Sequence, residues 1–135
     1  MKKIFIDANI ILRILTKDDE KQMEKAGGLF SKAISGDVLL VCGPPVLFEV
    51  AWTLEARYKV SNSRILDYIE SLLATPGLMM TDRGLVEDAV SRSRCSEVEF
   101  ADSYIAVLAG ASGCDSIATF NVSDFKKLDA ELYQL

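Results

Sequence analysis

The stretch IFIDANIIL, residues 4–12, places one carboxylate, Asp7, and one amide, Asn9, among seven apolar residues. The β-branched and aromatic residues predict a strand over residues 3–7, and the apolar spacing that follows predicts a helix over about residues 8–15. An ionised side chain in a run that is about to be buried needs a partner, because an unpaired buried charge is unfavourable. The first strand-to-helix junction therefore raises the question of what Asp7 binds.

The alternation of strand and helix patterns continues along the whole chain. The patterns predict further strands over residues 38–42, 77–81 and 115–120, a possible edge strand in the tail ELYQL, and helices over about residues 18–35, 45–58, 62–74, 82–94, 99–111 and 124–128. Strands that alternate with helices favour a parallel sheet. We therefore expect one α/β domain over residues 1–135, a three-layer α/β/α sandwich with a central, mostly parallel sheet of four or five strands.

The composition excludes several kinds of chemistry. The sequence has no histidine, which excludes imidazole-activated nucleophiles and histidine zinc sites. Three widely spaced cysteines favour reduced thiols over a disulfide framework. A net charge of -5 argues against simple electrostatic binding of nucleic acid, unless several acids hold cations. Neither a membrane-length apolar run nor a secretory signal is present, so we expect a cytoplasmic protein without membrane contact.

Two more isolated carboxylates repeat the opening pattern. Glu49 is the one polar residue in VLFEVAW, residues 46–52, and Asp102 stands near the start of the apolar FADSYIAVLA, residues 100–109. In a parallel sheet the carboxyl ends of the strands meet along one edge, beside the helix beginnings. We expect the isolated acids to meet at that edge, together with the polar residues of TFNVSD, namely Thr119, Asn121 and Asp124.

Clustered carboxylates predict a cation. They repel one another and stay ionised together only around positive charge. Oxygen ligands without histidine or cysteine favour hard ions, Mg²⁺ or Mn²⁺, which bind to a few carboxylates, water and phosphate. Such ions support in-line hydrolysis of a phosphodiester.

Each of these residues also has a structural interpretation. Asp7 and Asp124 are suited to N-caps, Asp102 to a first helical turn, Asn121 to a turn and Thr119 to a strand. Glu49 would instead pair with a distant base such as Arg57. The combination of all of them at strand ends favours a shared cation.

The segments IFIDAN, PPVLFEVAW, FADSYIAVLA and TFNVSDF resemble, in this order, the four signature segments of PIN-domain nucleases, above all small VapC-like toxins of toxin–antitoxin pairs. The resemblance implies an α/β/α sandwich, endoribonuclease activity with Mg²⁺ or Mn²⁺, a homodimer, and inhibition by an antitoxin protein. By this resemblance, Asp7, Glu49 and Asp102 match the three metal-binding acids of similar proteins.

The fourth acid departs from the pattern. Similar proteins often carry Asp where this chain has Asn121, and Asp124 offers a carboxylate three residues later. Either residue would then be the fourth ligand. Asn9 matches a polar position that orients the first acid or a water, and Thr119 matches a supporting hydroxyl. Arg13, on the helix that leaves Asp7, is a candidate contact for RNA phosphate.

Two other classes remain open. Phosphoryl-transfer domains also place Asp after the first strand of an α/β sheet, but they need a second acid nearby, where this chain has Asn9. A non-toxin or catalytically silent PIN-like module that binds proteins is the other alternative, and the departure at Asn121 keeps it open.

Overall fold

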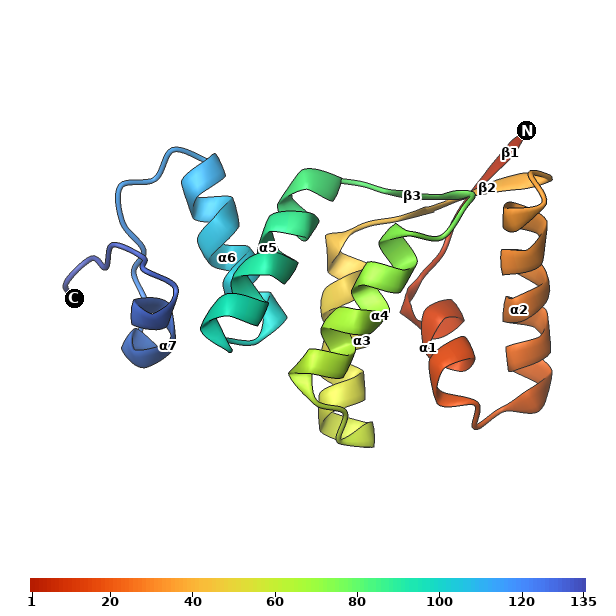
Figure 1. Ribbon diagram of the computed structural model, residues 1–135, viewed down its shortest axis with the longest axis horizontal. Coiled ribbons are helices and arrows are strands. Elements are labelled where there is room, and N and C mark those ends of the chain that lie inside the picture. The colour runs from red at the N-terminus through yellow and green to blue at the C-terminus, as the bar shows by residue number, and fades with distance from the viewer. The chain divides into compact units, whose positions relative to one another are not determined.

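A computed structural model describes residues 1–135 (Figure 1). Its elements are β1 (Lys2–Phe5), α1 (Ala8–Thr16), α2 (Glu20–Ile34), β2 (Val38–Cys42), α3 (Pro44–Tyr58), α4 (Asn62–Leu73), β3 (Leu78–Met80), α5 (Arg83–Ser96), α6 (Phe100–Ala111) and α7 (Val122–Lys127). These elements belong to two compact units, unit 1 from Met1 to Asp82 and unit 2 from Arg83 to Leu135. The fold class is α/β with a parallel sheet flanked by helices, as predicted.

Unit 1 holds the sheet, whose strand order is β1-β2-β3 with both pairs parallel. Two helices connect each strand to its neighbour in the sheet. Because such crossovers are nearly always right-handed, both pairs of helices are expected on the same face of the sheet. Burial agrees with this arrangement, because Leu40 and Cys42 are fully buried whereas Phe5 is 61% and Met79 44% exposed. Figure 1 shows α1 to α4 on one side of the strands.

The helices of unit 1 begin and end where local chemistry predicts. Asp7 caps α1 and Asp19 caps α2, each through a side-chain oxygen that accepts a backbone N–H. Gly43 precedes two prolines that begin α3, a position where the missing proline N–H costs nothing.

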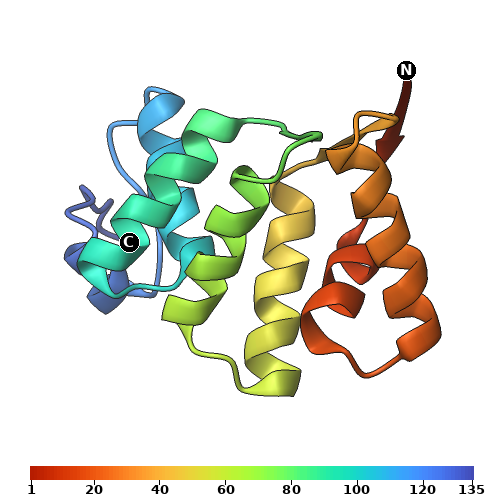
Figure 2. The same ribbon diagram turned by 45° about the vertical axis from the view of Figure 1, so that its right-hand side comes forward.

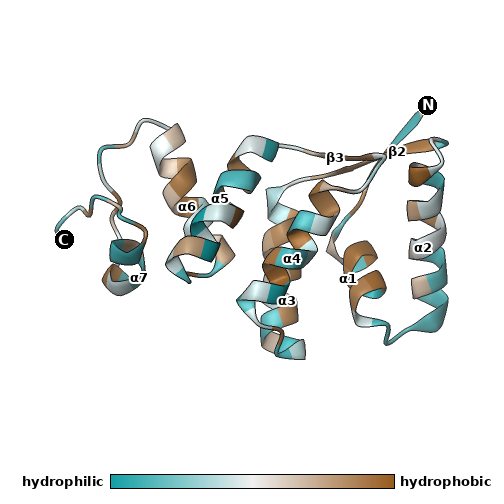
Figure 3. Cartoon of the chain, in the orientation of Figure 1, coloured by the Kyte–Doolittle hydropathy of each residue, from teal (hydrophilic) through white to brown (hydrophobic).

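The helices α3 and α4 lie side by side (Figure 2). Figure 3 shows α1 as mainly hydrophobic and α2 as mainly hydrophilic, in keeping with the buried share of each.

Unit 2 is built on the pair α5 and α6. The buried side chains on α5 include Val86, Ala89 and Val90, and those on α6 include Phe100 and Tyr104. Phe100 and Tyr104 also contact each other, with ring centroids 6.1 Å apart. A smaller cluster of buried residues anchors α7 and consists of Val98, Phe125 and Leu128. The start of α7 is thereby held beside α6.

The predicted fourth strand over residues 115–120 is wrong. That segment forms one isolated parallel bridge, between Ile117 and Leu132 of the tail, and the sheet has three strands rather than four or five. Strand propensity reflects the fit of side chains on a pleated, half-buried surface. Asp115 and Phe120 are exposed, so the segment lacks that surface. The edge strand expected in the tail is correspondingly reduced to Leu132.

The remaining elements match the predicted ones to within two residues at most ends, and VLLVC over residues 38–42 matches at both ends. Gly27 and Gly28 do not interrupt α2. The prediction of a single domain over residues 1–135 stays a prediction. No helix combines the length and the apolar character needed to cross a membrane.

Candidate functional site

Asp7 lies at the end of the first strand segment, as predicted, but its side chain is exposed. Its neighbours Ile6 and Ala8 are each 1% exposed, so the backbone enters the core while the carboxylate faces outward. The Oδ1 atom accepts a hydrogen bond from the backbone N–H of Asn9 at 3.1 Å, which is the N-cap of α1. The expectation of a buried acid is therefore wrong, because strand alternation turns this side chain away from the core.

Glu49 is also exposed, although VLFEVAW contains no other polar residue. Along α3 the exposed positions include Pro45, Glu49 and Trp52, and Trp52 is 67% exposed. A spacing of four and then three residues defines one face of a helix. The apolar run therefore concealed a solvent-facing stripe, and Glu49 needs no buried partner.

The edge of the sheet brings the beginnings of α1 and α3 into the same region of unit 1. Phe5 pairs with Val41, and Ile6 N–H donates to the Val41 carbonyl at 2.9 Å, so β1 and β2 stay paired up to the residue before Asp7. Asp7 and Gly43 then begin the helical segments. This confirms the predicted location of the first strand-to-helix junction at the carboxyl edge of the sheet.

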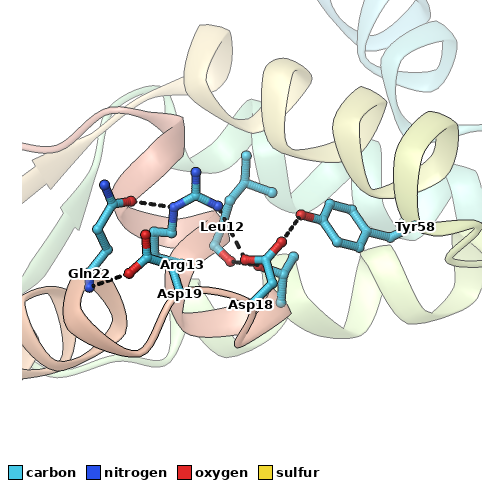
Figure 4. Close-up of polar contacts among 7 residues, drawn as sticks. Leu12, Arg13, Asp18, Asp19, Gln22 and Tyr58 are labelled. Atoms are coloured by element: carbon cyan, nitrogen blue, oxygen red, sulfur yellow. Dashed lines mark hydrogen bonds and ion pairs between the residues drawn. The ribbon is translucent and has the colours of Figure 1, made fainter.

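Arg13 lies in the last turn of α1, at the opposite end of the helix from Asp7. Its Nε donates to Oε1 of Gln22, and its Nη1 lies 3.3 Å from Oδ1 of Asp18 (Figure 4). Asp18 also accepts a hydrogen bond from the Tyr58 hydroxyl at the end of α3. These contacts give Arg13 a structural role in joining α1 to the α1–α2 turn, and the RNA contact suggested by the sequence stays a prediction.

Unit 2 brings three of the predicted site residues into direct contact. Asp102 stands in the first turn of α6, Asn121 is the N-cap of α7, and Asp124 stands in the first turn of α7. The Asn121 Nδ2 lies 3.3 Å from Oδ2 of Asp102 and 3.0 Å from Oδ2 of Asp124, and donates a hydrogen bond to each. Thr119 supports the same turn, because its Oγ1 accepts the Asn121 backbone N–H at 3.0 Å.

Electrostatics distinguish Asp102 within this cluster. Partial burial raises the pKa of the Asp102 carboxyl above its usual value, and the neighbouring charge of Asp124 raises it further. The hydrogen bond from Asn121 acts in the opposite direction. A cation beside the two carboxylates would remove the like-charge repulsion, so this pair is electrostatically suited to bind one.

The donor set of unit 2 fits a hard divalent cation. Mg²⁺ is commonly bound by one or two carboxylates and completed by water and substrate phosphate, rather than by a full cage of protein ligands. Asp102 and Asp124 provide two such carboxylates at the start of neighbouring helices. Neither unit has three Asp, Glu or Cys side chains grouped so that protein ligands alone would hold a metal. The ions that fit are therefore those that retain water and accept phosphate oxygens.

The predicted residues consequently fall into two sets, one in each unit. Asp7, Asn9 and Glu49 belong to unit 1, and Asp102, Thr119, Asn121 and Asp124 belong to unit 2. The amide bridge in the second set had no signal in the sequence, because Asn121 and Asp102 are 19 residues apart.

Comparisons with known proteins give one family. The model of the PIN domain family matches residues 4–131, nearly the whole chain. A search of the curated proteins gave no match.

Proposed function

Because the chain belongs to the PIN-domain family, whose members are generally nucleases, we propose that it is an endoribonuclease that depends on Mg²⁺ or Mn²⁺. The family assignment supports a nuclease-type hydrolase that binds nucleic acid. The observation that carries the metal dependence is the adjacent pair Asp102 and Asp124, joined through Asn121. Two neighbouring carboxylates with no basic side chain among their hydrogen-bond partners favour a divalent cation as their counter-charge.

The proposed ligands are the four acids Asp7, Glu49, Asp102 and Asp124. Asn9 and Thr119 support them, Asn9 through the backbone N–H that orients Asp7 and Thr119 through the turn that holds Asn121. A divalent cation would supply charge neutralisation at the phosphodiester and activate water for in-line attack. Hydrogen bonds from the Asn9 backbone N–H and the Asn121 amide orient the Asp7, Asp102 and Asp124 carboxylates, so that a phosphate would bind beside oxygen atoms that are already positioned.

The substrate and partners follow from the resemblance of the signature segments to VapC-like toxins. We propose that the protein acts on RNA in the cytoplasm, as the toxin of a type II toxin–antitoxin pair, forms a homodimer, and is inhibited by a cognate antitoxin. A non-toxin or catalytically silent PIN-like module that binds proteins is the alternative. The amide of Asn121 favours this alternative, because similar proteins often carry an acid at that position.

RNA cleavage tests the proposal. Purified protein is incubated with total RNA and with several defined transcripts, in Mg²⁺, in Mn²⁺ and in EDTA. Cleavage in either metal that disappears in EDTA and in Asp7→Asn and Asp102→Asn supports the proposal. Glu24→Gln on α2 and Asp88→Asn on α5 are matched controls, because both side chains are exposed.

Cleavage that survives both Asp7→Asn and Asp102→Asn would contradict the proposed mechanism. Equal cleavage in EDTA would contradict the metal dependence. Protein that binds a partner but cuts none of the RNAs in either metal would favour the silent binding module.

A further inference from the structure

The orientation of the Asn121 amide is fixed by its neighbours. Two carboxylates, which accept hydrogen bonds and cannot donate them, face the nitrogen end, and the backbone N–H of Asp124 faces the oxygen end at 3.5 Å. Turning the amide over would place its oxygen against two carboxylate oxygens and its NH₂ against an N–H donor. The side chain therefore presents donors, not an oxygen ligand, to Asp102 and Asp124.

The place of this bridge explains what it does to the two acids. Asp102 belongs to α6 and Asp124 to α7, so no helix sets the distance between their carboxylates. Two carboxylates beside each other repel when both are ionised. One NH₂ group that donates to both carboxylates offsets the repulsion and holds the two side chains beside each other.

We infer that Asn121 is a positioning residue that holds Asp102 and Asp124 together for a divalent cation, and that it is not itself a ligand. The inference deepens the proposed function and rests on it for the identity of the bound ion. It assigns the fourth carboxylate ligand to Asp124 and gives the amide a role that an acid at the same position would not fill.

Asn121→Ser separates the bridge from the helix cap. Serine is as good an N-cap as asparagine, so the hydroxyl can still accept the Asp124 N–H. It has no NH₂ to donate to Asp102. If Asn121 acted only as a cap, the Ser variant would keep the melting temperature (Tm) of the wild type.

The first measurement is the Tm in EDTA, where no cation contributes. We expect Asn121→Ser to lower the Tm by about 2–4 °C in the wild type. The same substitution should have no further effect in a protein that already carries Asp102→Ala and Asp124→Ala, because the bridge has lost both acceptors. An equal decrease in both backgrounds, or no decrease in the wild type, would overturn the bridge. A residue that acted only as a metal ligand would also show no coupling in EDTA.

The second measurement is the affinity for Mn²⁺ by isothermal titration calorimetry. Loss of a residue that orients metal ligands typically weakens binding by about tenfold or more, although every carboxylate remains. We expect that decrease for Asn121→Ser. Unchanged affinity would overturn the positioning role even if the bridge exists. Wild-type protein that binds no Mn²⁺ would contradict the proposed function and the role assigned to the bridge, whereas the coupling in EDTA would still report the bridge itself.

Discussion

The side-chain nitrogen of Asn121 lies 3.3 Å from Oδ2 of Asp102, which joins the N-cap of α7 to the first turn of α6. This contact places a half-buried carboxylate in a cluster that contains a second acid and no cationic side chain. Such an arrangement lowers the stability of the fold. Destabilising arrangements are common where side chains are retained for function.

Asp102→Asn is therefore expected to stabilise the metal-free protein. Burial and the charge of Asp124 raise the pKa of Asp102, so its ionised form is disfavoured in the folded state. An asparagine keeps an oxygen for the Asn121 bond and carries no charge. We expect the Tm in EDTA at pH 7 to rise on the order of 1–2 °C.

The pH dependence checks the cause. The penalty exists while Asp102 is ionised in the folded protein, and it disappears as the pH falls through its raised folded pKa. The difference in Tm between the variant and the wild type should shrink correspondingly on acidification. A lower Tm for the variant at pH 7 would show that the charge of Asp102 stabilises the fold.

Tyr58→Phe tests the polar contacts that join α3 to the α1–α2 turn. The hydrogen bond from Tyr58 is the largest cause that lowers the pKa of Asp18, followed by that from Thr16. A lowered folded pKa gives stability that is present above the unfolded value and is lost as the pH falls through the folded pKa. We expect a small decrease in Tm at pH 7, on the order of 1 °C for an exposed site, that vanishes in acid. Tyr133→Phe, in the exposed tail, should leave the Tm unchanged at both pH values.

Gly77→Ala tests the close approach between β3 and α2. A Cβ at residue 77 would lie 2.3 Å from the Ala33 carbonyl oxygen, and the backbone there has a φ of +78°. Both the clash and the left-handed backbone disfavour a side chain, so we expect a loss of about 2 kcal/mol or more in the free energy of unfolding. Gly84→Ala, where the added Cβ meets open space inside α5, should instead stabilise by roughly 0.5–1 kcal/mol. Chemical denaturation measures both, and equal effects would contradict the packing.

The three thiols should differ in reactivity. Cys42 is buried and its pKa is raised to about 11, because burial disfavours the thiolate, whereas Cys95 and Cys114 are exposed. Alkylation of the native protein at pH 8, followed by peptide mass spectrometry, should label Cys95 and Cys114 rapidly and Cys42 only after unfolding. Rapid labelling of Cys42 in the native protein would contradict its place in the sheet core.

Local patterns were sufficient to predict the helices and the first three strands. VLLVC is a continuous apolar run and forms β2 at the predicted residues, and the cap at Asp7 follows from the residue type alone. DSIATF is less apolar, because Asp115, Ser116 and Thr119 make up half of it. Its strand also depended on a distant pairing partner, and its one bridge is to Leu132. A local pattern does not specify such a partner.

The candidate site was predictable at the level of its residues, but not of its contacts. The sequence located Asp102, Asn121 and Asp124 near helix beginnings, as observed. It did not reveal that the amide nitrogen of Asn121 faces both acids, since this depends on how α6 and α7 pack. It also predicted burial of Glu49, because VLFEVAW conceals the exposed stripe that contains Trp52.

The most direct measurement is calorimetric titration of Mn²⁺ into the wild type, Asp7→Asn and Asp102→Asn, with Asp88→Asn as the control. The central proposal is that Asp7 and Asp102 each contribute to the binding of a divalent cation. It predicts that each of the two variants weakens Mn²⁺ binding by about tenfold or more, while the control keeps wild-type affinity. Wild-type affinity in either Asp7→Asn or Asp102→Asn would contradict the proposal.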